Sequence, residues 1–338
     1  MKNVTVIAEA GANHNRDWNI AVNLIKAAVR AKCDIVKFQT YSSEKLYSKS
    51  TPDFAGYTNI NKLIKDIELP REWQKDLKLY CDDLGIEFMS TPFDKEAIDE
   101  LYEIGVKRFK IAGFEATDPR IVRYAASTKL PLIITAGIGV DLRMIEEIYN
   151  WVKEENSDPD ITFLHGNNAY PTPFEDINLG QIQEIKKLRL PISVGLSDHT
   201  LGILAPPIAV GLGATTIEKH YTLDRTMPGP DHPFAIEPDE LAAMVENIRT
   251  TENCLGIKKA KTTTSEDSFI KATRSVVSKR EIKKGELITF DNVTTKRPFL
   301  ENCVPAKEFY NIQSCYVARN TIEEDDLITW DNIVRTRR

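Results

Sequence analysis

This sequence of 338 residues lacks the features that identify zinc-binding, disulfide-rich, membrane-spanning and secreted proteins. Its five cysteines are widely spaced and form no Cys-x-x-Cys pair, which disfavours a zinc site or a disulfide framework and is typical of reduced cytoplasmic thiols. No apolar run approaches the roughly 18 residues that a membrane-spanning helix needs. Residues 1–8 become polar too soon for a secretory signal. We therefore expect a cytoplasmic protein that does not cross a membrane.

Acidic residues outnumber basic residues in this sequence. The chain has 44 Lys and Arg residues against 50 Asp and Glu residues, a formal net charge of −6. This balance argues against nucleic acid or an anionic membrane as the main partner. The first β-rich run is not followed by the glycine-rich turn that a nucleotide-binding doubly wound sheet carries. With 42% hydrophobic residues, the chain can still bury a normal core.

Short β-rich runs recur along the first 220 residues, with helical patterns between them. In residues 19–32, for example, Ile20, Leu24 and Ala31 fall on one stripe of a helix. Strand–helix alternation predicts a parallel sheet, and eight repeats match the size of a (β/α)8 barrel. An open doubly wound sheet is the structural alternative. The expected strands are 4–8, 35–38, 86–89, 108–111, 132–134, 161–164, 192–195 and 215–218, and the expected helices are 19–32, 70–84, 94–105, 118–128, 141–155, 179–189, 203–212 and 238–254.

Every predicted strand contains or leads into a polar side chain. In a barrel these strand ends meet at one rim, which is where such barrels carry out chemistry. Some of these side chains are charged and lie inside apolar runs, and a buried charge costs roughly several kcal/mol unless it is paired or bound to a ligand. Stability alone therefore does not explain the set. In strand order it comprises Glu9; Lys37 and Gln39; Ser90 and Thr91; Lys110; Thr135; His165, Asn167 and Asn168; Ser197, Asp198 and His199; and Glu218, Lys219 and His220.

Lys37 and Lys110 form a candidate anion site. With hydroxyl groups from Ser90, Thr91, Thr135 and Ser197, two lysines can hold a phosphate and a carboxylate together. Burial lowers the pKa of a lysine, so either residue could instead form a Schiff base with a carbonyl substrate. The residue types alone leave such an aldolase open.

His199 and His220 end two strands that are neighbours in a barrel. Two imidazoles with few carboxylates leave positions open for substrate, which suits a Lewis-acid metal that polarises a carbonyl. Mn²⁺, Mg²⁺, Co²⁺ and Zn²⁺ all accept such ligands. The candidate acid–base carboxylates are Glu9, Glu115 and Asp231. Asp231 follows a Pro-Gly-Pro run, which predicts a rigid loop over the rim.

The segment 40–69, after the second strand, is long and of mixed composition. It contains Tyr41, Tyr47, Phe54 and Tyr57. Loops of this length in compact domains are usually functional, so we expect this segment to cover the rim of the barrel.

The composition changes near residue 258. Lysines and a Thr-Thr-Thr-Ser run predict a linker over 258–271, between a barrel domain of residues 1–257 and a small domain of residues 272–338. Residues 278–297 and 318–337 both contain Leu-Ile-Thr, an aromatic residue and Asp-Asn. This repeat predicts two related β-units about a pseudo-twofold axis. A domain this small is expected to dock on a barrel, its own or a partner's.

Several short stretches of the chain carry a family resemblance. They are residues 7–15, 36–40, 90–93, 170–173, 195–200, 217–220 and 228–231, together with 282–286 and 296–298 in the tail. These stretches resemble the sialic acid synthase (N-acetylneuraminate synthase) family, which includes legionaminic and pseudaminic acid synthases. The resemblance covers nearly the whole chain. It implies a TIM barrel joined to an antifreeze-like (SAF) domain, in a homodimer in which each small domain covers the partner's barrel.

The resemblance also implies an activity. The chain would be a transferase that condenses phosphoenolpyruvate with an open-chain sugar of the N-acetylmannosamine type and releases phosphate. Mn²⁺, or Mg²⁺ or Co²⁺ in its place, would be held by His199 and His220 and would bind the aldehyde oxygen of the sugar. Phosphoenolpyruvate would contact Lys37, Thr91, Lys110, Thr135, Asn168 and Ser197; the sugar and its protons would contact Glu9, Gln39, Glu115, Tyr170 and Asp231; and Arg297 would reach the acylamino group from the other subunit.

The chain departs from the family pattern mainly on the sugar side. Gly113-Phe114-Glu115 stands where many relatives have Ser-Gly-Glu and is more similar to pseudaminic acid synthases, and Phe299 stands where a glycine-rich turn is usual. The 228–231 stretch is more similar to the N-acetylneuraminate and legionaminate branches. A legionaminate or pseudaminate synthase acting on a 2,4-diacetamido-trideoxyhexose is therefore an alternative. A non-catalytic protein that binds sugar through its antifreeze-like domain is an alternative of another class.

Overall fold

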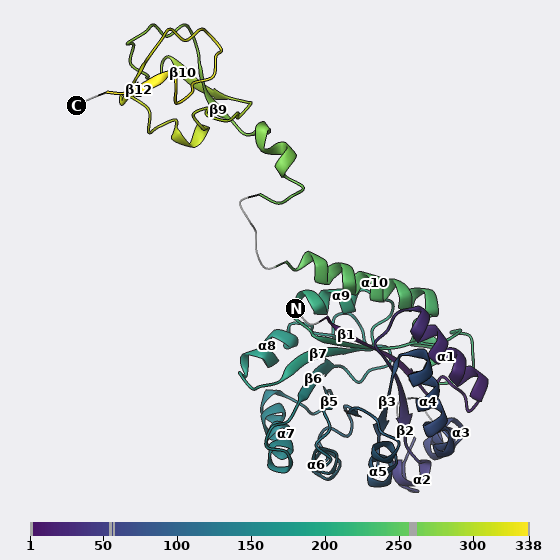
Figure 1. Cartoon of the computed structure of the whole chain (residues 1–338). Coiled ribbons are helices and arrows are strands. Elements are labelled where there is room, and N and C mark those ends of the chain that lie inside the picture. Colours follow the sequence, from purple (N-terminus) through teal and green to yellow (C-terminus); the bar gives the residue numbers. More distant parts are fainter. Residues whose placement is uncertain (1–2, 54–55, 57, 257–261, 337–338) are drawn as a thin grey trace. The chain divides into compact units, whose positions relative to one another are not determined.

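The computed structural model describes residues 3–53, 56, 58–256 and 262–336. The chain forms two compact units, Met1–Leu255 and Gly256–Arg338 (Figure 1). Each unit has its own hydrophobic core. Phe54, Tyr57 and the first part of the predicted linker, 258–261, lie outside the described residues. Among the helices that the structure describes, none is both long enough and apolar enough to cross a bilayer.

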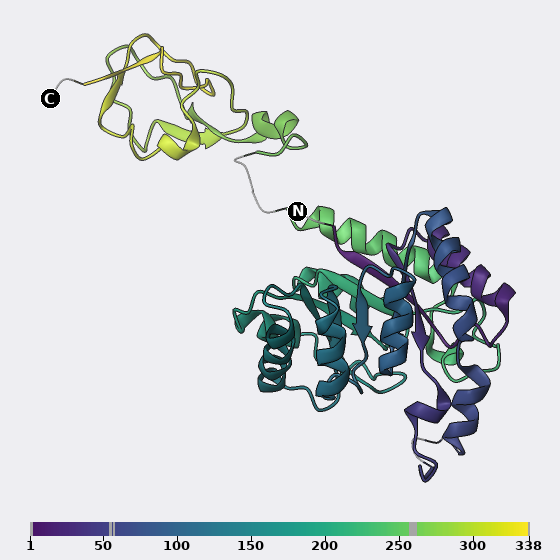
Figure 2. The same cartoon turned by 60° about the horizontal axis from the view of Figure 1, so that its bottom comes forward.

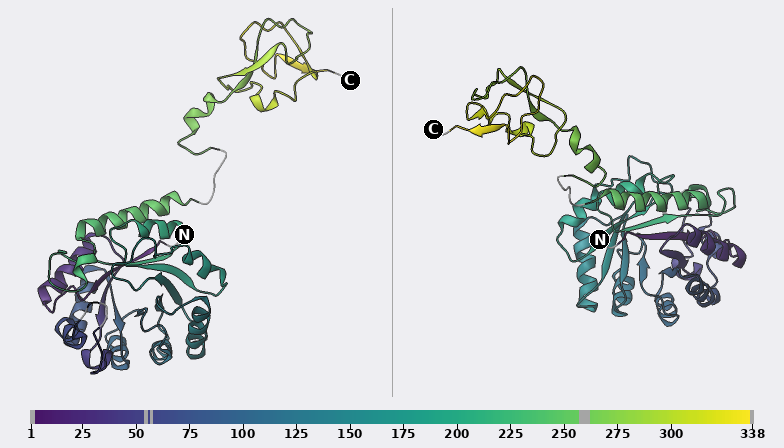
Figure 3. Two further views of the ribbon diagram at one scale, coloured as in Figure 1. Left: turned by 180° about the vertical axis from the view of Figure 1, so that it is seen from behind. Right: turned by 45° about the horizontal axis from the view of Figure 1, so that its top comes forward.

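The first unit is a nearly closed barrel of eight parallel strands surrounded by helices (Figure 3). The strands follow the order β3-β2-β1-β8-β7-β6-β5-β4, and β3 and β4 lie side by side where the circle closes. This arrangement confirms the predicted (β/α)8 barrel and excludes the open doubly wound sheet. The strands are β1 Thr5–Gly11, β2 Ile35–Thr40, β3 Glu87–Pro92, β4 Phe109–Ile111, β5 Leu132–Ala136, β6 Ile161–Gly166, β7 Ser193–Asp198 and β8 Thr216–His220.

The barrel helices begin and end at residues that favour those positions. Asp17, Asp94 and Asp141 each accept a backbone hydrogen bond from the first turn of a helix, and α4 ends at Gly85, where φ is 73°. The helices are α1 Trp18–Arg30, α2 Ser43–Leu46, α3 Ile60–Ile67, α4 Gln74–Leu84, α5 Lys95–Glu103, α6 Pro119–Ser127, α7 Leu142–Glu155, α8 Gln181–Lys187, α9 Ala205–Gly211 and α10 Pro238–Cys254, with short 3-10 helices at Arg71–Trp73 and His232–Phe234.

Inside the barrel, a polar layer of side chains follows an apolar one. A small buried cluster contains Ile7, Ile35, Met89, Ile133 and Leu164, one residue from each of five strands. Side chains alternate along a strand, so the residue two positions further on points to the same interior. Those residues are the polar Glu9, Lys37, Thr91 and Thr135, and in the fifth strand Gly166, which has no side chain. The strand period thus brings the predicted site residues to one end of the barrel.

The segment 40–69 contains two helices, α2 and α3, that the sequence analysis did not predict. Helix α3 carries Ile60, Leu63, Ile64 and Ile67 at the spacing of one helical face, and Asn59 caps its start by accepting from the Lys62 amide at 3.3 Å. In Figure 2 this segment extends beyond the rest of the barrel unit at the bottom of the view. Because the segment has a mixed composition, the sequence analysis did not detect this short amphipathic helix.

The second unit is built from the predicted repeat. Ile282 and Ile322 exchange two backbone hydrogen bonds, at 2.8 and 2.9 Å. The bond from the Gly285 amide to the Ala318 carbonyl has its counterpart in the bond from the Asp325 amide to the Ser278 carbonyl. These reciprocal pairs confirm the pseudo-twofold axis. The strands are β9 Ser275–Ser278, β10 Val293–Lys296, β11 Tyr316–Ala318 and β12 Ile333–Arg335, with 3-10 helices at Asp267–Ala272 and Ala306–Glu308.

Candidate active site

A polar pocket of about 40 Å³ lies at the carboxyl ends of the barrel strands. We call it the inner pocket. All but three of the predicted site residues line it, so the barrel brings together residues that are far apart in the sequence. The lining residues are Glu9, Lys37, Gln39, Thr91, Phe93, Lys110, Ala112, Gly113, Thr135, Asn168, Tyr170, Ser197, His199, Glu218 and His220.

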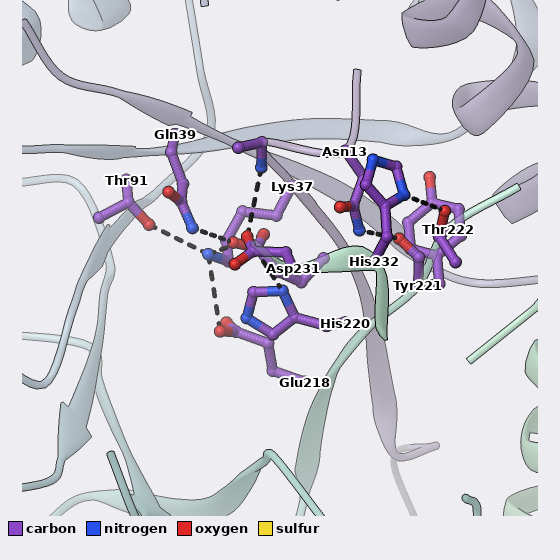
Figure 4. A network of polar contacts seen from close by, with 12 residues as sticks. Asn13, Lys37, Gln39, Thr91, Glu218, His220, Tyr221, Thr222, Asp231 and His232 are labelled. Carbon is purple, nitrogen blue, oxygen red and sulfur yellow. Dashed lines mark hydrogen bonds and ion pairs between the residues drawn. The ribbon is translucent and has the colours of Figure 1, made fainter. Parts of the chain in front are cut away.

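Two buried lysines and two buried carboxylates form the floor of the inner pocket. Lys37 Nζ lies 2.9 Å from Glu9 Oε2 and 3.5 Å from Glu218 Oε1, and it donates to Thr91 Oγ1 at 3.1 Å. Lys110 Nζ lies 3.1 Å from the same Glu218 oxygen. Figure 4 shows the Lys37 ammonium between Thr91 and Glu218. Glu218 therefore holds both cations in place.

These four groups shift one another's pKa values. Burial raises the pKa of Glu9 to about 7, and Lys37 only partly opposes that shift. Burial also lowers the pKa of Lys110, with Glu218 opposing. For Lys37 the attraction of Glu218 and Glu9 outweighs burial and raises the pKa, while Lys110 and Lys37 together outweigh burial and lower the pKa of Glu218. The charged forms of Lys37 and Glu218 are therefore stabilised in the floor, whereas burial works against the charged forms of Lys110 and Glu9.

Neutral polar groups complete the walls. The Thr135 hydroxyl is buried and has no hydrogen-bond partner in the described part of the chain. Asn168 Oδ1 accepts from the Ile138 amide at 2.8 Å. A Cβ atom on Gly137 would lie 2.0 Å from that oxygen, and one on Gly113 would lie 2.9 Å from it. Gly113, a departure from the family pattern, therefore makes room for Asn168.

His199 and His220 both line the inner pocket at the ends of neighbouring strands, with ring centroids 5.5 Å apart and planes tilted by 57°. The His199 ring donates from Nδ1 to the Asn167 carbonyl at 2.6 Å, so its neutral form carries the lone pair on Nε2. His220 Nδ1 is buried without a hydrogen-bond partner among the described residues. Burial lowers the pKa of His199 to about 4 and that of His220 well below its usual value.

Neutral imidazoles with free lone pairs are the form in which histidine binds metals, so this pair fits a divalent ion with open coordination positions. The described residues contain no cluster of three or more His, Cys, Asp or Glu side chains that could hold an ion alone. Substrate or water would have to supply the remaining ligands.

A second ion pair is formed by Asp198 and Lys219, which precede His199 and His220 in the sequence. Lys219 Nζ lies 2.7 Å from Asp198 Oδ2 and also donates to the Thr200 carbonyl. Asp198 in turn accepts from the Thr200 amide at 2.9 Å. Both charged side chains are buried. The pair ties the end of β7 to β8, which fixes the backbone that carries His199 and His220.

An apolar cavity of about 210 Å³ adjoins the inner pocket. We call it the outer cavity. Helices α2 and α3 form one of its sides, so the segment 40–69 contributes directly to the candidate site. The lining residues are Ala12, Gln39, Tyr41, Leu46, Tyr47, Ile60, Leu63, Ile64, Ile67, Phe93, Ala112, Phe114, Tyr170, His220, Pro230 and Asp231.

Three predicted site residues lie outside the inner pocket. Asp231 lines the outer cavity, where its Oδ2 lies 3.8 Å from His220 Nδ1 and burial raises its pKa to about 6. Glu115 lines neither space; one of its oxygens is buried without a hydrogen-bond partner in the described chain, and burial raises its pKa to about 7. Arg297 is exposed in the second unit. Only Asp231 of the three therefore borders the site in the barrel unit.

The sequence analysis placed Glu218 at the rim but gave it no role. The sequence does contain a signal for a functional role, because Glu218 is a charged residue in an apolar strand, two positions before the candidate metal ligand His220. The other histidines hold loops in place: the Arg16 amide donates to His14 Nδ1 at 3.0 Å, and His165 Nε2 donates to the Ile177 carbonyl at 2.6 Å. His232 lies 2.6 Å from the Thr222 hydroxyl (Figure 4).

The chain is similar to known proteins over both of its units. Residues 24–260 match the NeuB family, and residues 273–334 match the SAF domain. The chain is 41% identical to an uncharacterised protein of Methanocaldococcus jannaschii over 97% of this chain and 94% of that one. It is 38% identical to the N,N'-diacetyllegionaminic acid synthase of Legionella pneumophila, again over 97% and 94% of the two chains.

The solved structure of N-acetylneuraminic acid synthetase from Leptospira borgpetersenii superposes with a TM-score of 0.72 at 34% identity, covering 80% of this chain and 90% of that chain. The family match spans most of the barrel unit and contains all the inner-pocket residues except Glu9. The chain is therefore an enzyme of the NeuB family of nonulosonic acid synthases, with a C-terminal SAF domain.

Proposed function

We propose that the chain condenses phosphoenolpyruvate with the open-chain form of an amino sugar of the N-acetylmannosamine type and releases inorganic phosphate. The observation that carries this proposal is the inner pocket, in which two buried lysine ammonium groups and two neutral imidazoles face the same small space. The cations suit a multiply charged anion, and the imidazoles suit an ion bound to a carbonyl.

Phosphoenolpyruvate fits the lysine side of the inner pocket. Lys37 and Lys110 would neutralise its phosphate and carboxylate, and the unpartnered Thr135 hydroxyl would donate to one of its oxygens. Glu218 already orders both ammonium groups, so little reorganisation is needed when the anion binds.

The sugar aldehyde would lie on the histidine side. His199 and His220 would hold a divalent metal, Mn²⁺ first and Mg²⁺ or Co²⁺ in its place, and a metal there would supply Lewis-acid polarisation of the carbonyl. C3 of phosphoenolpyruvate would then form a bond to the aldehyde carbon. The resulting cation at C2 would take up water, and the tetrahedral adduct would expel phosphate.

Two carboxyl groups are suited to the proton transfers. Glu9, with a pKa of about 7, borders the inner pocket and would accept a proton from the water that adds at C2. Asp231, with a pKa of about 6, borders the outer cavity near His220 and would exchange protons with the sugar oxygens. Gln39 donates to Glu9 Oε1 at 2.7 Å and would keep that carboxyl in position.

We further propose a homodimer in which the SAF domain of one chain covers the barrel of the other. The family resemblance supports this arrangement, as does the exposed position of Arg297 in the second unit. In that assembly Arg297 would reach the acylamino group of the sugar. Sedimentation of the full chain tests the dimer, and mixing a His220→Ala chain with an Arg297→Ala chain tests the exchange, since only a swapped heterodimer restores one complete site.

The experiment for the proposed function is a phosphate-release assay with phosphoenolpyruvate, added Mn²⁺ and a panel of acceptors, followed by mass spectrometry of the product. The panel contains N-acetylmannosamine, 2,4-diacetamido-2,4,6-trideoxyhexoses and mannose. Release that needs all three components, with a product mass equal to the sum of acceptor and pyruvate, is the expected result. No release with any acceptor would overturn the proposal.

The depressed pKa of Lys110 favours one second candidate, a Schiff-base aldolase. Its ion pair with Glu218 at 3.1 Å opposes that shift and favours the ammonium form, which is not nucleophilic, and so argues against it. Borohydride reduction in the presence of pyruvate separates the two. A covalent adduct on Lys110 would support the aldolase, while complete loss of activity with a chelator would support the synthase.

A further inference from the structure

His232 is a buried histidine to which the proposed mechanism gives no role. It directly follows Asp231 in the loop after β8, and its exposed fraction is 0%. Both ring nitrogens have a partner, since Nε2 lies 3.2 Å from Asn15 Oδ1 and Nδ1 lies 2.6 Å from Thr222 Oγ1. Figure 4 shows the contact with Thr222. The ring therefore connects its own loop to the loop after β1 and to the chain just beyond β8.

The two partners determine which nitrogen of His232 carries the proton. Asn15 Oδ1 can only accept, so the ring donates from Nε2, and Nδ1 accepts from the Thr222 hydroxyl. Burial lowers the pKa of His232, which agrees with a neutral ring. A buried ring that is bonded on both sides cannot turn without leaving a polar atom unpaired. The orientation of His232 is therefore fixed.

Two glycines leave the space that this arrangement needs. A Cβ atom on Gly229, where φ is 148°, would lie 2.8 Å from His232 Cδ2 and 3.2 Å from Asn15 Oδ1. A Cβ atom on Gly11, where φ is 49°, would lie 2.7 Å from Asp231 Oδ2. Any side chain at either position would have to displace its neighbour. The backbone on both sides is thus shaped around Asp231 and His232.

The Asp231 carboxyl has little support of its own. In the described part of the chain it accepts one hydrogen bond, from the Ala12 amide, and that bond is long at 3.5 Å. His220 Nδ1 lies farther away, at 3.8 Å. Asn15 follows Ala12 by three positions, so the bond from His232 to Asn15 holds the two loops at the spacing that places Asp231 against Ala12. The position of the carboxyl therefore depends on the residue beside it.

We infer that His232 is a positioning residue, which bridges Asn15 and Thr222 and thereby holds the Asp231 carboxyl in place for the reaction. His232 lines neither the inner pocket nor the outer cavity, so it acts through its neighbour and not on the substrate. This inference rests on the proposed function, in which Asp231 exchanges protons with the sugar. Loss of either bond should lower turnover and leave the binding of phosphoenolpyruvate, on the lysine side, unchanged.

Variants of the two partners test this role while His232 itself stays intact. Asn15→Gly removes the amide and tolerates the left-handed backbone, since φ at Asn15 is 46°. Thr222→Val replaces the hydroxyl with a methyl group, and Thr222→Ser keeps it. Because a misplacement of about 1 Å can cost up to about a hundredfold in rate, we expect kcat to fall about tenfold in Asn15→Gly and Thr222→Val, and less than about threefold in Thr222→Ser. The KM for phosphoenolpyruvate should not change in any of them.

Each variant has a matched control elsewhere in the barrel unit. Asn178→Gly also removes an asparagine with a left-handed backbone, at φ 47°, and Thr128→Val also removes a hydroxyl, one that donates to the Ala125 carbonyl at 2.6 Å. Neither residue lines the inner pocket or the outer cavity. Both controls should keep the kcat of the parent.

A double-mutant cycle with Asp231→Asn tells positioning from a general loss of structure. If His232 acts through Asp231, adding Asn15→Gly to Asp231→Asn should cause no further fall in kcat, because the group being positioned is already gone. Two independent losses would multiply instead. The turn that begins at His232 also places the Phe234 ring 5.2 Å from the His220 ring, so the affinity for Mn²⁺ is measured by calorimetry without substrates and should be unchanged in Asn15→Gly.

The outcomes separate this inference from the proposed function. If the parent releases no phosphate with any acceptor of the panel, the proposed function is wrong, and the role of Asp231 falls with it. If the parent is active, the synthase stands, and the inference is overturned when Asn15→Gly or Asp231→Asn keeps the kcat of the parent, or when the two losses multiply. A fall in Mn²⁺ affinity parallel to kcat in Asn15→Gly would also overturn it, since the effect would then act through His220.

Discussion

The inner pocket and the outer cavity share five lining residues but are built by different rules. The inner pocket takes its residues from strand ends, so the barrel fixes their positions, and it is crowded with charge: Lys37 and Lys110 both lie within 3.5 Å of Glu218. The outer cavity takes much of its lining from a short helix in a connecting segment, and its chemistry is apolar. The strand ends at the rim of the barrel thus position the charged groups of the inner pocket. Helix α3 lies in a connecting segment, where residues can change without disturbing the barrel.

This contrast predicts that changes in the two places affect different substrates. Inner-pocket changes should impair the use of phosphoenolpyruvate and metal whatever the acceptor. Outer-cavity changes should alter the preference among acceptors and leave the KM for phosphoenolpyruvate alone.

The largest effect is expected from Lys110→Met. Removing this cation takes away a preorganised partner for phosphate or carboxylate, so kcat/KM for phosphoenolpyruvate should fall about a thousandfold with every acceptor. Steady-state phosphate release measures the loss. Lys62→Met, an exposed lysine paired with Asp66, is the control and should stay close to the parent. Activity of Lys110→Met within about tenfold of the parent would contradict the anion site.

A somewhat smaller effect is expected from His220→Ala. With one of the two candidate ligands gone, kcat should fall about a hundredfold, and the affinity for Mn²⁺ measured by calorimetry without substrates should fall in parallel. His165→Ala removes a histidine that only donates to the Ile177 carbonyl and should keep the affinity for Mn²⁺. Treatment of the parent with a chelator should abolish activity, and added Mn²⁺ should restore it. Unchanged Mn²⁺ affinity in His220→Ala would remove that histidine from the metal site.

The inner pocket could be predicted from the sequence because strand periodicity determines where most of its side chains point. Glu9 follows Ile7 by two positions and Lys37 follows Ile35 by two, so recognising the strands places both residues inside the barrel. Glu218 was assigned no role because its function depends on which lysines surround it. That information exists only after β2, β4 and β8 converge.

The outer cavity could not be predicted in the same way. The apolar stripe of α3 spans two turns in a segment of mixed composition, and nothing in its spacing says which surface it faces. The family pattern pointed to Glu115 as a site residue; its side chain lines neither space, but Lys110 of the inner pocket is close enough to oppose the rise of its pKa. Residues in turns after strands do not have the fixed direction that strand residues have, so their placement needs the structure.

Phe114→Ala tests whether the outer cavity acts on the sugar alone, and we expect its effect on activity to be moderate. Phe114 lines the outer cavity and is 58% exposed, so its truncation should raise the KM for the sugar about three- to tenfold and leave the KM for phosphoenolpyruvate unchanged. Phe174→Ala is the matched control, since Phe174 is 54% exposed and lines neither space. Should both KM values rise together in Phe114→Ala, the two regions would not be functionally separate.

Glu115→Gln is expected to have the smallest effect on activity and tells a structural carboxyl from a catalytic one. Burial raises the pKa of Glu115 to about 7, so the folded state holds this proton more tightly than the unfolded chain does. The parent should therefore lose stability as pH rises from about 4.5 to about 7, by an amount on the order of 1–3 kcal/mol.

The amide that replaces the carboxyl in Glu115→Gln does not titrate, so the melting temperature of this variant relative to the parent should increase between about pH 5 and pH 8, while kcat stays within about tenfold of the parent. A loss of kcat beyond about a hundredfold, together with the disappearance of a titration near pH 7 from the rate profile, would instead make Glu115 an acid–base group. In that case the turn after β4 would have to bring its carboxyl to the substrate, and the site would extend beyond the inner pocket and the outer cavity.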